Sequence, residues 1–239
     1  MNFLDLLANG VVPKYSTDIL LLVLGYILCA LLGYTLGSLN FALIISKTKY
    51  HDDIRKYGSK NAGMTNMLRT YGKKDAALTF LGDALKTALA IFLGMLIMGR
   101  YNGGNYMCAI FAIIGHIFPC FFGFRGGKGV VAAAVTILML NPIAFAVIIV
   151  MFVIIVAISK YISLGSVICA MAYPLVINVL SAPAEKGTAS IFALIISIIV
   201  IIMHKDNIKR LMTGKESKIS LGKKKTKKFT VSQENKNNK

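Results

Sequence analysis

Residues 19–46, ILLLVLGYILCALLGYTLGSLNFALIIS, contain no charged side chain. The run is longer than the roughly 20 apolar residues that cross the hydrocarbon core of a bilayer as a helix. It also lacks the basic region that precedes the apolar part of a cleaved secretion signal. We therefore expect this segment to remain in the protein as its first membrane span.

Further apolar stretches follow, in a chain that is 56% hydrophobic with a mean hydropathy of +0.68. They lie at residues 76–98, 106–122, 130–159, 162–180 and 189–203. This composition is that of a polytopic membrane protein and excludes an ordinary soluble domain. Asn141-Pro142 interrupts the stretch 130–159, and a proline inside a helix removes a hydrogen bond and clashes with the preceding turn. That stretch is either one kinked helix or two short helices.

The positions of lysine and arginine decide between these alternatives, because both residues collect in short cytoplasmic loops near span ends. The loop 47–74 and the tail from Lys205 hold most of the 27 Lys and Arg residues. Both lie on one side only if the chain turns at Asn141-Pro142. We therefore predict an all-α polytopic protein of the cell membrane with seven transmembrane helices, some of them short, its N-terminus outside and its C-terminus inside. Residues 1–217 would form a single integral membrane domain, and residues 218–239 a basic disordered cytoplasmic tail.

Two kinds of partner are set aside by the distribution of charged and metal-binding residues. The net charge of +17 could indicate nucleic acid, but the run Lys223 to Lys228 is a basic tail beside a membrane. Attraction to anionic lipid headgroups, at about 1 kcal/mol per cation near the surface, is the simpler interpretation. The three histidines and four cysteines are scattered without the spacing of metal ligands. We expect membrane lipid as a partner, no nucleic acid, no metal or other cofactor, and a chain that functions as a monomer.

Three clusters rich in glycine, amide and cationic residues lie at the ends of apolar stretches. They are Gly58 to Arg69, His116 to Gly129, and His204 to Arg210. On the seven-helix topology all three face the cytoplasm, although they are far apart in sequence. Their hydroxyl, amide and cationic groups are suited to binding phosphate. The clusters therefore predict one anion-binding site at the cytoplasmic face.

The first cluster has the sequence GSKNAGMTNMLR at residues 58–69. A helix that began near Asn61 would place Asn61, Thr65 and Arg69 on one face, at i, i+4 and i+8. Ser59 would then lie near the helix start, where free backbone N–H groups and the helix dipole favour an anion. The alternative is an ordinary serine N-cap followed by a surface helix.

The second cluster contains GHIFP at residues 115–119 and FRGGKG at residues 124–129. Glycines on both sides of Lys128 would let backbone N–H groups approach a phosphate closely, while the ammonium supplies charge. A nucleotide P-loop is excluded, since Phe122 stands where that motif needs glycine and Gly129 where it needs Ser or Thr. A plain loop turn is the alternative.

The third cluster, HKDNIKR at residues 204–210, directly follows the last apolar stretch. His204 and Asn207 would face the same way if the helix continues, and a basic flank that snorkels to the membrane surface is the alternative. Within the second stretch, Asp83 and Lys86 are also spaced i, i+3. Charges inside a membrane are costly, so we expect these two to form an ion pair, with a role in substrate binding as the alternative.

Two other kinds of function fit parts of this pattern. A transporter for an anionic solute would explain the anion-binding residues and the intramembrane charges, but transporters typically show internal repeats with binding near the midplane. This sequence shows no repeat between its halves, and its clusters lie at one face. A lipid-binding scaffold recruited through its tail would not need Asn61, Asn66 or the Gly-Gly-Lys-Gly loop.

Taken in order, these segments resemble the bacterial integral membrane acyl-phosphate:glycerol-3-phosphate acyltransferases. The likeness covers about residues 20–218 and includes Gly37-Ser38, Ile54-Arg55, Asp83-Ala84-Leu85-Lys86 and the three clusters, ending at Gly214. It implies a seven-helix enzyme that moves an acyl group from acyl phosphate to the 1-hydroxyl of glycerol 3-phosphate. The products would be lysophosphatidate and phosphate, in the opening step of phospholipid synthesis.

The resemblance also implies roles for particular residues. Catalytic roles fall to Ser59, Arg69 and Lys128. The implied substrate-binding residues are Asn61, Gly63, Thr65, Asn66, His116, Gly126, Gly127, Gly129, His204 and Asn207. Lys60 departs from the family pattern, which has glycine there, and this departure leaves open whether the position needs a positive φ.

The chemistry suits these residue types, because both substrates are anionic and the acyl phosphate carries a good leaving group. Positioning and charge neutralisation can supply most of the catalysis. The His-Asp base of another large class of glycerol-phosphate acyltransferases is excluded, since Lys56, Phe121 and Lys209 occupy the positions five residues after each histidine. Our hypothesis is that the donor's own phosphate removes the proton. His116 could instead be a packing residue under the glycine-rich loop.

Overall fold

The computed structural model describes residues 5–6, 9–12, 18–99, 103–183 and 186–219. Within these ranges the regular structure is entirely helical. Six helical segments are long and apolar enough to cross a membrane, and the shorter apolar helix Val130–Leu140 lies beside them. These findings confirm the predicted all-α polytopic fold. The side of the membrane on which each end lies stays a prediction, and the predicted tail lies outside the described residues apart from Lys218 and Ile219.

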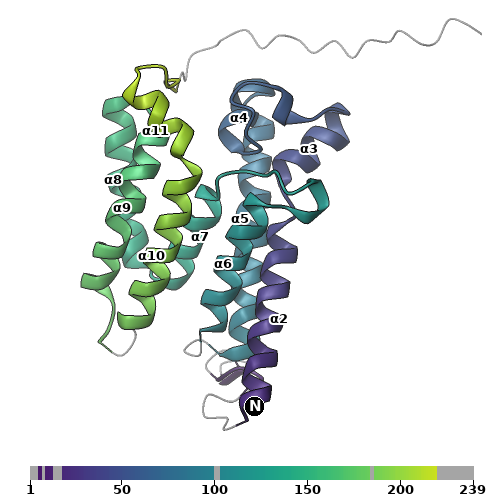
Figure 1. The fold of residues 1–239 in the computed structure, drawn as a ribbon, viewed down its shortest axis with the longest axis vertical. Coiled ribbons are helices and arrows are strands. Elements are labelled where there is room, and N and C mark those ends of the chain that lie inside the picture. The colour runs from purple at the N-terminus through teal and green to yellow at the C-terminus, as the bar shows by residue number, and fades with distance from the viewer. Residues whose placement is uncertain (1–4, 7–8, 13–17, 100–102, 184–185, 220–239) are drawn as a thin grey trace, which may run out of the picture.

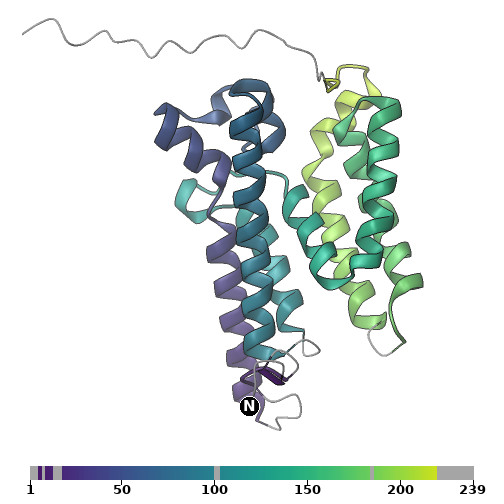
Figure 2. The same ribbon diagram turned by 180° about the vertical axis from the view of Figure 1, so that it is seen from behind.

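The helices form two groups with α7 between them (Figures 1 and 2). One group packs α2, α5 and α6 together, and the other packs α8, α9 and α10. The bounds are α2 (Ile19–Gly37), α3 (Phe41–Tyr50), η1 (Ile54–Lys56), α4 (Met64–Thr70), α5 (Lys73–Met98), α6 (Gly104–Ile117), η2 (Cys120–Phe122), α7 (Val130–Leu140), α8 (Pro142–Ser159), α9 (Ile162–Leu180), α10 (Lys186–Met203) and α11 (Lys205–Met212).

The first apolar run is divided into two helices. Helix α2 ends at Gly37, and α3 begins after Asn40. The Asn40 side chain caps α3 by accepting a hydrogen bond from the backbone N–H of Leu43 at 3.1 Å. This cap is the physical reason why the run that was expected to form a single span turns. Helix α3 is inclined to the axis of α2 and lies at the same end of the bundle as α4 (Figure 1).

The interruption at Asn141-Pro142 separates two helices, as the seven-helix topology predicted. Helix α7 ends at Leu140, and Asn141 caps α8 by accepting a hydrogen bond from the backbone N–H of Ala144 at 2.9 Å. Pro142 occupies the first turn of α8, where its missing N–H costs nothing. The alternative of one kinked helix over residues 130–159 is therefore wrong.

Glycines bring α2 and α6 into backbone contact. A β carbon at Gly33 would lie 2.5 Å from the carbonyl oxygen of Cys108, and one at Gly37 would lie 2.2 Å from that of Ala112. Such close approach between small residues is a common way for membrane helices to pack. It places the end of α6, at His116, next to the break between α2 and α3.

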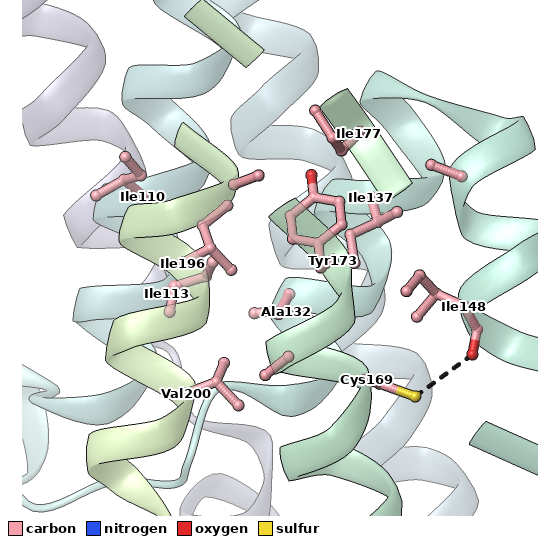
Figure 3. Close-up of a cluster of buried hydrophobic side chains, with 14 of the residues drawn as sticks. Ile110, Ile113, Ala132, Ile137, Ile148, Cys169, Tyr173, Ile177, Ile196 and Val200 are labelled. Carbon is pink, nitrogen blue, oxygen red and sulfur yellow. Dashed lines mark hydrogen bonds between the residues drawn. The ribbon is translucent and has the colours of Figure 1, made fainter. Parts of the chain in front are cut away.

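A buried apolar cluster connects α6 and α7 to the second group of helices. Figure 3 shows Ile113 from α6 and Ile137 from α7 facing Tyr173 of α9 and Val200 of α10. These side chains are almost fully buried, and their close packing holds the helices together by van der Waals attraction. The cluster fixes α10, and therefore α11 beyond it, relative to the loop that follows α6.

Candidate functional site

The three predicted clusters lie at the same end of the helix bundle, on α4, on the loop before α7 and around α11 (Figure 1). The Lys128 ammonium donates a hydrogen bond to Asn207 Oδ1. Arg69 Nη2 donates to the carbonyl oxygen of Ser217 at 3.3 Å. The structure thus joins the second cluster to the third, and the first cluster to the segment that follows α11.

The first cluster is a loop followed by a short helix. Helix α4 begins at Met64, with Gly63 as an N-cap that has no side-chain hydrogen bond. The expectation of a helix from Asn61 is therefore wrong, as is the alternative of a serine N-cap at Ser59. Gly58 and Lys60 have φ values of 56° and 59°, which are incompatible with a right-handed helix. Lys60 thus adopts a positive φ, which the sequence left open.

Asn66 organises the loop that carries Ser59. Its buried side chain accepts a hydrogen bond from the backbone N–H of Ser59 at 3.0 Å. Its amide nitrogen lies 3.2, 3.0 and 3.0 Å from the carbonyl oxygens of Ile54, Tyr57 and Asn61. These contacts explain an amide at this position, because only Asn or Gln offers an acceptor and two donors on one group. Asn66 therefore shapes the loop from beneath.

The glycines of the second cluster pack directly on the end of α6. The backbone N–H of Gly126 donates to the carbonyl oxygen of Ile117 at 2.8 Å, and that of Gly127 donates to the carbonyl oxygen of His116 at 3.1 Å. A β carbon at Gly127 would lie 2.1 Å from His116 Nε2, and one at Gly126 would lie 2.0 Å from the His116 carbonyl oxygen. Glycine is therefore required at both positions for close packing. The two N–H groups donate hydrogen bonds within the protein, whereas they were expected to bind phosphate.

His116 belongs to a buried polar network inside the membrane-spanning part of the chain. Lys86 Nζ lies 2.7 Å from Asp83 Oδ1, 2.9 Å from the carbonyl oxygen of Leu39 and 3.1 Å from His116 Nδ1. Three acceptors thus match the three N–H bonds of the ammonium. Because an ammonium can only donate, His116 Nδ1 accepts. The predicted pairing of Asp83 with Lys86 is confirmed, and His116 lies between this pair and the glycine-rich loop.

Lys128 lies in a partly desolvated and strongly cationic environment. Burial, together with the charges of Arg210 and Arg69, lowers the pKa of Lys128 to about 8, although Glu216 acts in the opposite direction. Several cations held close together in a half-buried place repel one another, and an anion bound between them relieves that repulsion. The electrostatics therefore favour a bound anion beside Lys128.

The third cluster begins with a break in the last long helix. Helix α10 ends at Met203, and His204 has φ −100° and ψ 7° before α11 begins. The buried His204 donates from Nδ1 to the carbonyl oxygen of Val200 at 2.7 Å, because a carbonyl can only accept. Burial also lowers the pKa of His204. The ring is therefore neutral near pH 7, with a lone pair on Nε2.

Glu216 is a member of the site that the sequence analysis did not identify. One carboxylate oxygen accepts from Asn207 at 2.7 Å and from Ser163 at 2.8 Å, and the other accepts from Arg210 at 2.7 Å. Burial opposes ionisation of Glu216, but the hydrogen bonds from Arg210, Asn207 and Ser163 outweigh it and lower its pKa. Segment 205–218 holds only two carboxylates, Asp206 and Glu216, among five Lys and Arg residues, and this pattern was the available signal.

Within the described ranges, no three His, Cys, Asp or Glu side chains gather closely enough to hold a metal ion. Lys128 contacts the Asn207 amide and lies near the cations Arg69 and Arg210 and the carboxylate Glu216.

The fold and the site define an integral membrane protein with a cationic, amide-lined cluster at one end of its helix bundle. Residues 27–214 match the family model described as Glycerol-3-phosphate acyltransferase. The chain is 39% identical over 202 residues to a glycerol-3-phosphate acyltransferase of Clostridioides difficile (strain 630), covering 82% of this chain and 97% of the relative. It is 41% identical over 191 residues to one of Neisseria gonorrhoeae (strain NCCP11945), covering 78% of this chain and 94% of the relative.

Solved structures give the same result. The fold is similar to the crystal structure of PlsY (YgiH), an integral membrane glycerol 3-phosphate acyltransferase, in its glycerol 3-phosphate form, with a TM-score of 0.75, 30% identity, and coverage of 82% of this chain and 96% of that one. The lysophosphatidic acid form has a TM-score of 0.73 and 29% identity, and covers 82% of this chain and 95% of that one. The chain belongs to the glycerol-3-phosphate acyltransferase family.

Proposed function

We propose that this protein transfers an acyl group from acyl phosphate to the 1-hydroxyl of glycerol 3-phosphate and releases lysophosphatidate and phosphate, the opening step of phospholipid synthesis. The observation that carries the proposal is the contact of Lys128 with Asn207 beside Arg69 and Arg210. Membership of the family supports glycerol 3-phosphate as the acceptor. An acyl phosphate donor fits this site because both substrates then bring a phosphate to the same group of cations.

The roles of the individual residues follow from their chemistry. Lys128 and Arg69 neutralise the phosphate charges, and the Ser59 hydroxyl donates a hydrogen bond from the loop that Asn66 holds in place. Neutral His204 presents a lone pair at Nε2, which suits a hydroxyl of glycerol better than a phosphate oxygen. The remaining substrate-binding residues are Asn61, Gly63, Thr65, Gly129 and Asn207. Asn66, His116, Gly126 and Gly127 act by shaping the loops.

The reaction needs no covalent intermediate with the protein. The oxygen of the 1-hydroxyl attacks the carbonyl carbon, the bond from that carbon to the phosphate oxygen breaks, and the hydroxyl proton passes to the departing phosphate. Cations beside the leaving phosphate stabilise the charge that develops on it, which is a larger effect in a desolvated site than in water. Holding both phosphates fixes the distance between the hydroxyl and the carbonyl.

The site is placed at the cytoplasmic face of the cell membrane in this proposal, with the protein acting as a monomer. The support is the concentration of Lys and Arg in residues 47–74 and 205–218, which flank the site. Membrane lipid would surround the helices and receive the product. The many exposed leucine, isoleucine and valine side chains on α2, α8 and α10 are suited to contact with acyl chains.

The choice of donor is the direct test of this proposal. Detergent-purified protein would be given glycerol 3-phosphate with either a long-chain acyl phosphate or the corresponding acyl thioester, and lysophosphatidate would be measured. We expect product from acyl phosphate, and its loss in Ser59→Ala but not in Ser181→Ala, a matched control outside the site. Equal product from the thioester would contradict the assignment of the donor.

A further inference from the structure

Arg55 lies in the short turn η1, outside the phosphate site, yet its side chain contacts the loop that leads to Lys128. Arg55 Nη1 donates hydrogen bonds to the carbonyl oxygens of Phe122 at 2.8 Å and Arg125 at 2.7 Å. One guanidinium nitrogen therefore bridges two points of the loop, and the second point is three residues before Lys128.

Asp53 fixes the other edge of the same guanidinium. Arg55 Nε lies 2.9 and 3.1 Å from the two carboxylate oxygens, and Nη2 lies 2.6 Å from Oδ2. Asp53 also accepts the backbone N–H of Arg55 at 2.9 Å. These bonds set the plane of the guanidinium, so that Nη1 is directed at the loop. A lysine has no planar fork and cannot bind the carboxylate and both carbonyls in this way.

The loop between the two bonded carbonyls has a conformation that needs support. Gly123 and Phe124 have φ values of 68° and 56°. The left-handed region is costly for a phenylalanine and persists where the surroundings hold the backbone in place. The bonds from Arg55 to Phe122 and Arg125 enclose this turn on both sides.

The same η1 turn is also bound to the first cluster. Asn66 Nδ2 donates to the carbonyl oxygens of Ile54 and Tyr57 at 3.2 and 3.0 Å, and Asn66 Oδ1 accepts from Ser59. A continuous series of hydrogen bonds therefore runs from Ser59 through Asn66 and the turn to Arg55, and from Arg55 to the loop that carries Lys128. Two segments that are far apart in sequence are held to one short turn.

We propose that Arg55 is a positioning residue that sets the distance between the Ser59 and Lys128 parts of the phosphate site. The inference rests on the proposed function, in which these two parts bind phosphate. Arg55 touches no substrate in this proposal. It acts because a misplacement of about 1 Å can lower the rate on the order of a hundredfold.

The test compares Arg55→Lys with wild type and with Lys56→Ala. The lysine keeps the charge and loses the bridge, while the side chain of Lys56, in the same turn, forms an ion pair with Asp52 at the surface. We expect Arg55→Lys to raise the KM for glycerol 3-phosphate by about tenfold or more, with an unfolding midpoint near that of wild type, and Lys56→Ala to keep the wild-type KM. A wild-type KM in folded Arg55→Lys would overturn the proposal.

A charge swap separates the bridge from the ion pair. Asp53→Arg combined with Arg55→Asp can restore the pairing of the two side chains, but an aspartate at position 55 cannot donate to the carbonyls of Phe122 and Arg125. We expect the double variant to keep the raised KM. Recovery of the wild-type KM would show that the ion pair alone matters and would refute the positioning role.

A further variant decides the case in which Arg55→Lys does not fold. Asp53→Asn leaves the guanidinium in place but loosens its orientation, so it should raise the KM less, and an unchanged KM there would overturn the proposal. Lys128→Ala is measured in parallel. If Lys128→Ala has full activity, the proposed site is wrong. If Lys128→Ala loses activity but Arg55→Lys keeps the wild-type KM, only the positioning role is refuted.

Discussion

Replacement of Lys128 with alanine removes the cation at the centre of the proposed site. At about 4 Å, two unit charges interact by roughly 4 kcal/mol where the effective dielectric constant is about 20. The lowered pKa of Lys128, about 8, reflects such a partly desolvated place. Loss of one oxyanion-binding donor typically costs about 2.7–4 kcal/mol. We therefore expect Lys128→Ala to lose on the order of 2–4 kcal/mol of transition-state stabilisation, which is a fall of about 30-fold to 1,000-fold in kcat/KM.

The assay is steady-state formation of lysophosphatidate by purified protein, with both substrates varied. Lys209→Ala is the matched control, because it removes the same charge from an exposed position of α11, close to Asn207 in sequence. Surface changes of this kind usually alter free energies by within about 0.5 kcal/mol, so the control should stay within about threefold of wild type. The reasoning would be refuted if Lys128→Ala also stayed within about threefold, or if both variants lost activity equally.

Other variants and conditions test the remaining parts of the site. The KM for glycerol 3-phosphate should rise as the pH is raised through about 8, because the Lys128 amine loses its charge above its pKa; Lys128→Arg should lack this rise, and a rise in both would point to another group. Gly127→Ala places a β carbon 2.1 Å from His116 Nε2 and 2.8 Å from the Ala62 carbonyl oxygen; it should destabilise the fold by about 1–3 kcal/mol and raise the KM, and a wild-type melting curve would contradict the packing described. His116→Ala should weaken binding, and a variant that binds both substrates but never turns over would contradict proton removal by the donor phosphate. Deletion of Lys223 to Lys239 should leave activity nearly intact, and a loss of more than about tenfold would mean that the tail is part of the site.

The membrane-spanning architecture could be predicted because uncharged runs and the positions of Lys and Arg report it directly. Asn141-Pro142 marked the turn between α7 and α8, since proline is favoured in the first turn of a helix and disfavoured inside one. The break after α2 could not be predicted in the same way. Apolar residues continue across it, and the break shows only in the structure, where Asn40 has an extended backbone and accepts a hydrogen bond from Leu43.

The three clusters predicted where the site lies, but not how each residue is used. Polar side chains grouped at span ends are visible in sequence, whereas the partners of each side chain depend on contacts between distant segments. Asn66 and the glycines at 126 and 127 were expected to face phosphate, and the structure engages them in holding loops. Glu216 was not identified as part of the site, nor Arg55 as a residue that contacts its loop, because these contacts appear only once α9, α11 and the loop after α6 are assembled.

The central claim is an acyl transfer from acyl phosphate to glycerol 3-phosphate. Its most direct test is the release of phosphate from a long-chain acyl phosphate by the detergent-purified protein, with and without glycerol 3-phosphate. We expect release that depends on glycerol 3-phosphate and equals the lysophosphatidate formed. No release by well-folded protein supplied with lipid would rule out acyl transfer from acyl phosphate, and would favour transport of an anionic solute instead.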